Sequence, residues 1–147
     1  MRKIAFLLLL PLLASCASTV NLDAAENSND PGCAEVSVRY PKEIGDLKER
    51  YTNAQATAAW GEPAAVIARC GLEPVEVSTL SCVTSEDVDW LVDDSQAPSY
   101  RFISFATTPA VEVIVDSQVI SGVSALDAMA NAVKQLPVTK RCSAIGN

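Results

Sequence analysis

The carboxylates in the middle of the chain are the first candidates for chemistry. The stretch SEDVDWLVDD holds five of them within nine residues: Glu86, Asp87, Asp89, Asp93 and Asp94. Oxygen ligands of this kind suit calcium, but their spacing does not follow the EF-hand loop and the glycine of that loop is missing. Carboxylates that flank a short strand more often keep a sheet edge solvated. We therefore expect no metal site here.

The absence of histidine limits the catalytic chemistry further. No histidine occurs anywhere in the sequence, which removes the commonest general base, the Ser–His and Cys–His pairs and nearly all zinc catalysis. No phosphate loop or dinucleotide fingerprint occurs either. Ser124 lies in GVSAL, which lacks the second glycine of a nucleophile elbow, so a helix-capping role is the better interpretation. We expect no enzyme and no cofactor; a hydrolase using paired carboxylates on glycan is the catalytic alternative.

The amino terminus has a different chemistry, centred on Cys16. Two basic residues precede an apolar run at 4–13, and small residues follow, an order typical of a secretory signal peptide. The run is too short to span a membrane as a helix. The segment LASC, residues 13–16, resembles the lipobox of bacterial lipoproteins, in which the cysteine sulfur receives a diacylglycerol and the chain is cut before the cysteine.

These features predict a signal peptide at 1–15 and a lipidated Cys16 as the first mature residue. Two acyl chains, such as palmitate, suffice for stable anchoring. The expected location is the cell membrane, on its extracytoplasmic face. Cleavage near Ser15 without lipid, which would give a secreted protein, is the alternative.

Four further cysteines, Cys33, Cys70, Cys82 and Cys142, indicate disulfide bonds. An even number in an exported chain of this size is typical of a disulfide-stabilised domain. Zinc sites use closely spaced cysteine pairs, whereas the nearest pair here is twelve residues apart. Of the three possible pairings, we favour Cys70–Cys82 across a predicted hairpin and Cys33–Cys142 between the ends of the domain.

Length and charge narrow the class of protein. The mature part of the 147-residue chain fits one domain. Without Arg2 and Lys3, 9 basic residues face 18 acidic ones, a net charge of −9. This charge argues against nucleic acid and against adhesion to anionic lipid. With only 5% aromatic residues and abundant Ala and Val, the core is expected to be modest and to hold no large apolar cavity.

The pattern of apolar residues predicts an α+β fold. Residues 16–32 are polar and predict a flexible tether, so the domain should cover 33–147. After a short alternation at Val36 and Val38, a short helix is expected from Pro41, and a longer one over 124–136 with an apolar stripe that Pro137 ends. Strands are expected near 57–60, 64–70, 75–82, 88–92, 100–106 and 110–116.

In the strand at 110–116, alternate valines should face the core. The predicted architecture is an antiparallel sheet of about five strands, with an N-terminal short helix and a C-terminal helix packed on one face, stabilised by disulfides.

Five residues are candidates for binding a partner because such side chains are useful at interfaces when exposed. They are Trp60, Arg69, Trp90, Arg101 and Glu112. The alternative for each is a place in the core or on a solvated strand face. The two arginines lie in strand-like segments, where each needs water or a partner carboxylate.

Several stretches of residues 33–116 resemble one known family. They are Trp60-Gly61-x-Pro63, Arg69-Cys70-Gly71, Asp89-Trp90 and the run Pro109-Ala110-Val111-Glu112-Val113. The chain resembles the actinobacterial exported and lipid-anchored proteins catalogued as domain of unknown function 3515. That family often has a basic residue before the Pro-Ala-Val run, where this chain has Thr107 and Thr108. The resemblance implies a Gram-positive envelope and an exported domain, and it implies no activity.

The sequence therefore predicts a lipid-anchored envelope protein that acts as a non-catalytic binding or accessory module. Its expected contacts are the membrane, through Cys16, and an envelope protein partner. A module that binds a small molecule or a cell-wall glycan is the alternative.

Overall fold

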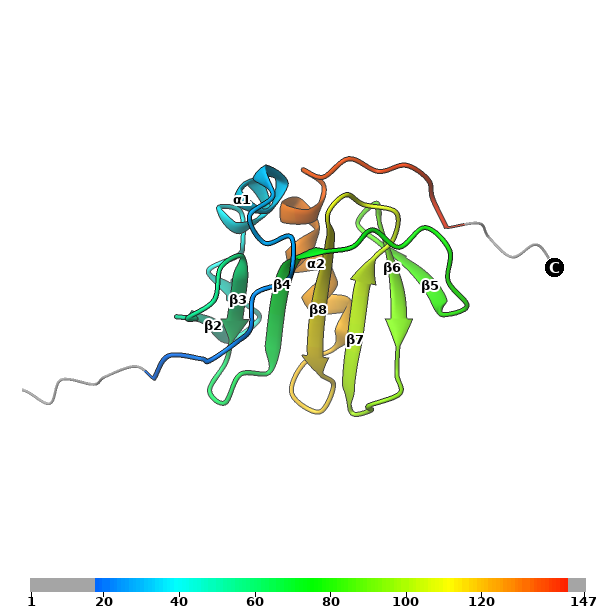
Figure 1. The fold of residues 1–147 in the computed structure, drawn as a ribbon. Helices are drawn as coiled ribbons and strands as arrows, with labels where there is room; N and C mark the ends of the chain where they lie inside the picture. Colours follow the sequence, from blue (N-terminus) through cyan, green and yellow to red (C-terminus); the bar gives the residue numbers. More distant parts are fainter. Residues whose placement is uncertain (1–17, 143–147) are drawn as a thin grey trace, which may run out of the picture.

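A single antiparallel sheet, with two helices on one of its faces, forms the framework of the protein (Figure 1). The structure is a computed structural model, and it describes residues 18–142. The eight strands lie in the order β1-β2-β3-β4-β8-β7-β6-β5. Their bounds are β1 Glu43–Ile44, β2 Leu47–Arg50, β3 Thr57–Trp60, β4 Val66–Leu72, β5 Ser81–Ser85, β6 Val88–Asp93, β7 Ser99–Ser104 and β8 Ala110–Asp116.

The strands with the strongest alternation are confirmed. β3, β4, β6, β7 and β8 all form close to the predicted residues. The sheet is larger than the expected five strands because β1 and β2 form a hairpin at Gly45, where φ is +57°, instead of the helix predicted from Pro41. The predicted strand at 75–82 is also wrong: only Val75 forms an isolated bridge, to Phe105, and β5 begins at Ser81.

Both helices are short. The second helix lies close to the predicted one, whereas the first lies before the position predicted for it. α1 covers Pro31–Ser37, where the end of the tether and a short alternation of apolar residues were expected; Asp30 caps it by accepting a hydrogen bond from the Gly32 amide. α2 covers Gly122–Val133 and is capped by Ser121, which accepts from the Ser124 amide at 3.1 Å, so Ser124 is not the cap.

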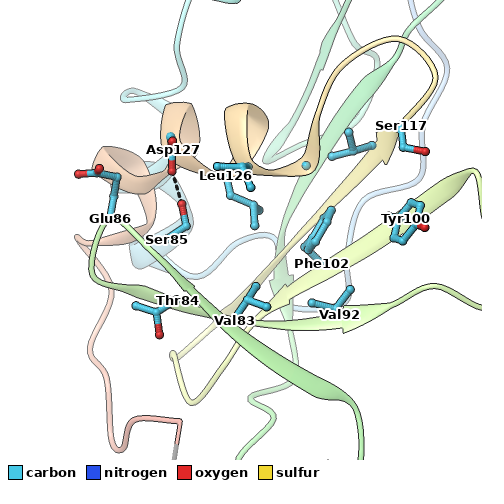
Figure 2. Close-up of a pocket in the computed structure, with 13 residues that line it drawn as sticks. Val83, Thr84, Ser85, Glu86, Val92, Tyr100, Phe102, Ser117, Leu126 and Asp127 are labelled. Atoms are coloured by element: carbon cyan, nitrogen blue, oxygen red, sulfur yellow. Dashed lines mark hydrogen bonds between the residues drawn. The ribbon is translucent and has the colours of Figure 1, made fainter. Parts of the chain in front are cut away.

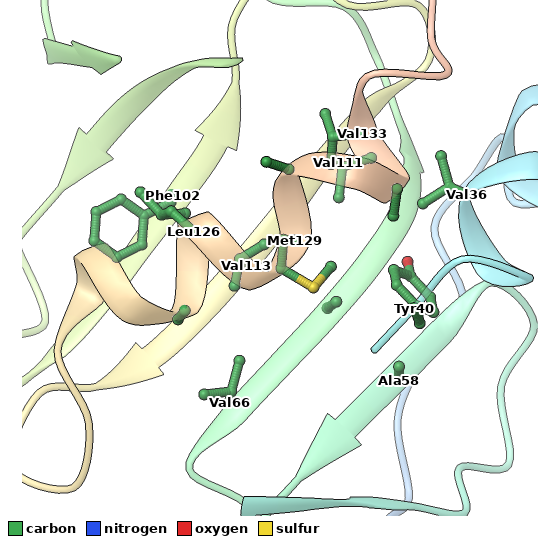
Figure 3. Close-up of a cluster of buried hydrophobic side chains, with 14 of the residues drawn as sticks. Val36, Tyr40, Ala58, Val66, Phe102, Val111, Val113, Leu126, Met129 and Val133 are labelled. Atoms are coloured by element: carbon green, nitrogen blue, oxygen red, sulfur yellow. The ribbon is translucent and has the colours of Figure 1, made fainter. Parts of the chain in front are cut away.

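The hydrophobic core lies between these helices and the sheet (Figure 3). The predicted stripe of α2 is confirmed: Leu126, Met129, Ala130, Val133 and Leu136 are all buried. It packs on the predicted valine face of β8, formed by Val111, Val113 and Val115, each fully buried. The apolar face that the 3.6-residue period gives α2 therefore packs on the apolar face that alternation gives β8, and together they form one apolar layer.

The disulfide bonds join other partners than the favoured ones. Cys33 of α1 binds Cys70 of β4, and Cys82 of β5 binds Cys142. The favoured Cys70–Cys82 pairing assumed that β4 returns directly into a neighbouring strand. β4 instead pairs with β3 and β8, while β5 lies at the far edge of the sheet. Cys70 therefore faces α1 and cannot reach Cys82.

The segment before α1 lies across the sheet face that the helices leave free (Figure 1). The Val20 amide donates to the Tyr51 carbonyl at 2.8 Å, and the Asn27 amide donates to the Gly71 carbonyl at 2.9 Å. Gly71 has φ +110°, and a Cβ there would lie 2.5 Å from the backbone of Asn27. From Val20 onward, the predicted tether is thus part of the domain.

Tyr40 gives a first testable prediction. Its ring packs edge-on against Trp60, with centroids 5.9 Å apart, and its buried hydroxyl has no hydrogen-bond partner within residues 18–142. Burial raises the pKa of Tyr40 well above its usual value of 10.0. The folded protein therefore holds the phenol proton to a higher pH than the unfolded chain does. The free energy of unfolding is unaffected by the titration of this group below about pH 10 and falls as the pH rises further.

We expect Tyr40→Phe to raise the free energy of unfolding by about 1 kcal/mol at pH 7, because it removes a buried polar group that lacks a partner. It should also reduce the loss of stability above pH 10. Urea unfolding at pH 7, 10 and 11 measures both effects. A variant that is less stable than the wild type at pH 7, with the same alkaline slope, would contradict this account.

Candidate functional site

An apolar groove lies between the amino-terminal half of α2 and the strands β5, β6 and β7 (Figure 2). Its volume is about 560 Å³, within the range of about 300–1,000 Å³ that is usual for ligand sites. Most of its lining is apolar: Val83, Val92, Tyr100, Phe102, Val115, Val123 and Leu126. This corrects the expectation that a chain so rich in Ala and Val holds no large apolar cavity.

Two aromatic residues, Phe102 and Tyr100, form the floor of the groove. Phe102 is buried, and its ring stacks on that of Tyr100 with centroids 6.4 Å apart. Gly122, at the start of α2, lies directly on Phe102, because a Cβ there would come within 2.7 Å of the ring. Glycine thus allows α2 to approach the sheet closely enough to form one wall.

The rim of the groove is apolar as well. Val83 of β5 is 41% exposed and Val123 of α2 is 66% exposed, and both line the groove. A buried apolar floor with an exposed apolar rim, here Val83 and Val123, is the usual composition of a site that binds a ligand or a partner.

One end of the groove is acidic. Asp127 accepts a hydrogen bond from the Ser85 hydroxyl, and Glu86 lies beside this pair (Figure 2). No Lys or Arg lines the groove among the residues that the structure describes. The site therefore favours an apolar group that carries a positive charge or a hydrogen-bond donor at one end.

The groove exists because two helices are too few for this sheet. Eight strands spaced about 4.8 Å apart span roughly 34 Å, whereas each helix covers about 10 Å. α1 packs on β4, and α2 packs on β8 and reaches β5, but neither helix packs to a similar extent on β6 or β7, so the faces of these two strands remain only partly covered. The groove is this uncovered part of the apolar layer.

A second cluster lies on the opposite face of the sheet, where Glu112 of β8 pairs with two arginines. Its Oε1 accepts from Arg69 Nε of β4 at 2.8 Å, and its Oε2 accepts from Arg101 Nε of β7 at 2.5 Å. The Glu112 side chain is 3% exposed, while the arginines are 33% and 38% exposed. The structure thus brings together three of the predicted site residues, with the partner carboxylate that the arginines require.

The two tryptophans do not reach the surface. Trp60 and Trp90 are fully buried, and the indole N–H of Trp60 donates to the Pro41 carbonyl at 2.8 Å. Both are core residues in this conformation, so neither offers a contact surface, and the alternative interpretation as core holds for them.

The five carboxylates of residues 86–94 do not lie together in a shared site. Asp89 is buried and accepts from the Thr84 hydroxyl at 2.6 Å and the Cys142 amide at 2.8 Å. Hydrogen bonds from Ser95, with a smaller contribution from the Arg101 charge, hold the pKa of Asp93 below its usual range. Within residues 18–142, no three acidic or cysteine side chains are placed to hold a metal ion.

The groove residues were not among the predicted site residues. No sequence pattern singled them out; Val123, for example, lies just before the predicted helix at 124–136, three residues from Leu126 of its apolar stripe. Cys16 and the predicted signal peptide lie outside the described residues. No helix in the described part of the chain has the length and apolar character needed to cross a membrane.

Comparison with known sequences assigns the chain to a family. No curated protein and no solved structure matches it. The family described as "Protein of unknown function (DUF3515)" matches residues 7–141, which is nearly the whole chain. The protein therefore belongs to the DUF3515 family.

Proposed function

We propose that this protein is a non-catalytic binding module, anchored by lipid on Cys16 to the extracytoplasmic face of an actinobacterial cell membrane. In this proposal it acts as an accessory subunit for another protein of the cell envelope. The single observation that carries the binding role is the apolar groove, with its buried floor and its exposed walls at Val83 and Val123. The anchor rests on the LASC segment at 13–16 and on the apolar run before it.

The shape of the groove favours a protein partner. Its walls expose apolar side chains to solvent, as a surface does that is covered in a complex. The acidic end at Glu86 and Asp127 would select a partner that carries a basic or hydrogen-bond-donating group. The volume of about 560 Å³ also favours a second candidate, a small apolar molecule held in the same place.

Site-specific photo-crosslinking in the native envelope tests this proposal. Benzoylphenylalanine in place of Val123 should give one defined protein adduct. The matched control carries the same group in place of Val38, which is 77% exposed at the carboxyl-terminal end of α1 and does not line the groove, and it should give none. The Cys16→Ala version of the Val123 probe should lose most of the adduct, because the anchor places the protein beside its partner.

The outcomes separate the candidates. A single protein adduct from position 123 alone supports an accessory role. An adduct with a small molecule or lipid, seen as a discrete mass increase, supports the second candidate instead. Equal labelling from positions 123 and 38, or none from either, would rule the groove out as the binding site.

A further inference from the structure

One edge of the sheet is open beside the groove. β5 forms its ladder with β6, and no residue within 18–142 pairs with its other side. Proteins usually protect such an edge with a charge, a proline, a bulge or a covering segment. β5 reads Ser-Cys-Val-Thr-Ser, without charge or proline, and its five pairs with β6 run without a register shift.

The opposite edge of the sheet is protected. β1 has only two residues, with Lys42 and Glu43 at its start, and it is too short to template another strand. Beside β2, Val20 forms a bridge with Thr52 and covers the next stretch of chain. The contrast between the two edges makes the exposure of β5 a specific feature of this fold.

Within the described residues, the chain after α2 does not close the β5 edge. Cys142 reaches Cys82 by a disulfide, and its amide donates to Asp89 on β6. Arg141 donates to the carbonyl of Asp87 in the turn after β5. These contacts hold the segment to one face of β5 and β6, opposite to Val83, because neighbouring residues of a strand point to opposite faces.

We infer that β5 accepts an extended segment of the partner protein as a ninth strand of the sheet. The inference rests on the proposed function, since the partner would use the same groove. Backbone hydrogen bonds to β5 would supply affinity, and alternate side chains would supply specificity. Because Val83 faces the groove, side chains of the added strand beside it would point in the same direction, toward the apolar lining.

Charge identifies the kind of segment. Between Arg69 and Arg101 the chain carries seven carboxylates and no basic residue, and this stretch includes both β5 and β6. Glu86 and Asp127 lie where the groove ends. The partner segment should therefore be apolar at alternate positions and basic near one end.

A displayed library of random eight-residue peptides, selected on the purified protein in lipid nanodiscs, provides the probe. Enriched peptides should share alternating apolar residues with a Lys or Arg near one end. N-methylation of alternate backbone amides should weaken binding at least about tenfold for one set of amides and leave it within about twofold for the other, because a strand faces its neighbour with every second residue.

Two protein variants locate the site. Val83→Gln should weaken the enriched peptides by about tenfold or more, whereas the matched exposed variant Val38→Gln should not. No enrichment, peptides without alternation, or binding that survives both N-methylations or Val83→Gln would overturn the inference. If benzoylphenylalanine at position 123 still captures one protein in that case, the groove binds its partner by another mode and only the strand addition fails.

Discussion

Replacing both Cys33 and Cys70 by alanine is expected to lower the free energy of unfolding by about 2–5 kcal/mol. This bond joins α1 to β4 over 37 residues of sequence, and both half-cystines are fully buried in the core. Its loss would free the unfolded chain and would also leave a void between α1 and the sheet. Urea unfolding of the oxidised protein and of the double variant measures the difference.

The second disulfide provides the matched control. Cys82→Ala with Cys142→Ala opens a loop of 60 residues, so the constraint on the unfolded chain is at least as large. Cys82 is exposed, however, and its removal leaves no void in the core. We therefore expect a smaller loss than for the buried bond. A larger loss for this pair would show that loop closure, and not core packing, dominates.

The features that could be predicted from the sequence are those set by local period. Tyr100 to Asp116 alternates over two strands with a turn between them, and the apolar stripe from Leu126 to Leu136 repeats over nearly three turns. The apolar stripe of the helix and the valines of β8 are buried as their periods predict, but Ala110–Val113 is buried on both faces of the sheet. The helix predicted from Pro41 was wrong because Ile44 and Leu47 are three residues apart. This spacing suits one face of a helix, but it also suits the two arms of a hairpin closed by Gly45.

What could not be predicted depends on strand order. The pairing of the cysteines required knowing that β8 lies between β4 and β7, which no local pattern shows. The groove depends on a mismatch between the width of the sheet and the number of helices, so its lining residues carry no shared sequence signal. For the cluster of Arg69, Arg101 and Glu112, the sequence predicted that each arginine in a strand needs water or a carboxylate partner. It did not predict which carboxylate this would be.

Both candidate surfaces now have separate physical roles. The groove is uncharged apart from its acidic end, and its walls are open to a partner. In the Arg69–Glu112–Arg101 cluster, the one carboxylate pairs with both arginines, and the cluster lies on the opposite face of the sheet. Stability measurements should therefore respond mainly to the cluster, and partner binding mainly to the groove.

Replacing Glu112 by glutamine is expected to cost about 2–3 kcal/mol of unfolding free energy. Glutamine keeps the shape but leaves two guanidinium groups side by side without the carboxylate that joins them. Removing one member of a buried ion pair costs about 3–5 kcal/mol, and we lower the estimate because the arginines are about one-third exposed and water will screen them. Urea unfolding at pH 7 measures the change.

A triple variant separates a structural role of the cluster from a binding role. Arg69→Met, Glu112→Leu and Arg101→Met together remove every charge, and such apolar replacements are often neutral or stabilising. We expect this variant to recover most of the stability that Glu112→Gln loses and to keep the crosslink from position 123. A Glu112→Gln protein as stable as the wild type would show that the carboxylate is not needed for folding. A triple variant that folds but loses the crosslink would move the partner's contact surface to this face of the sheet.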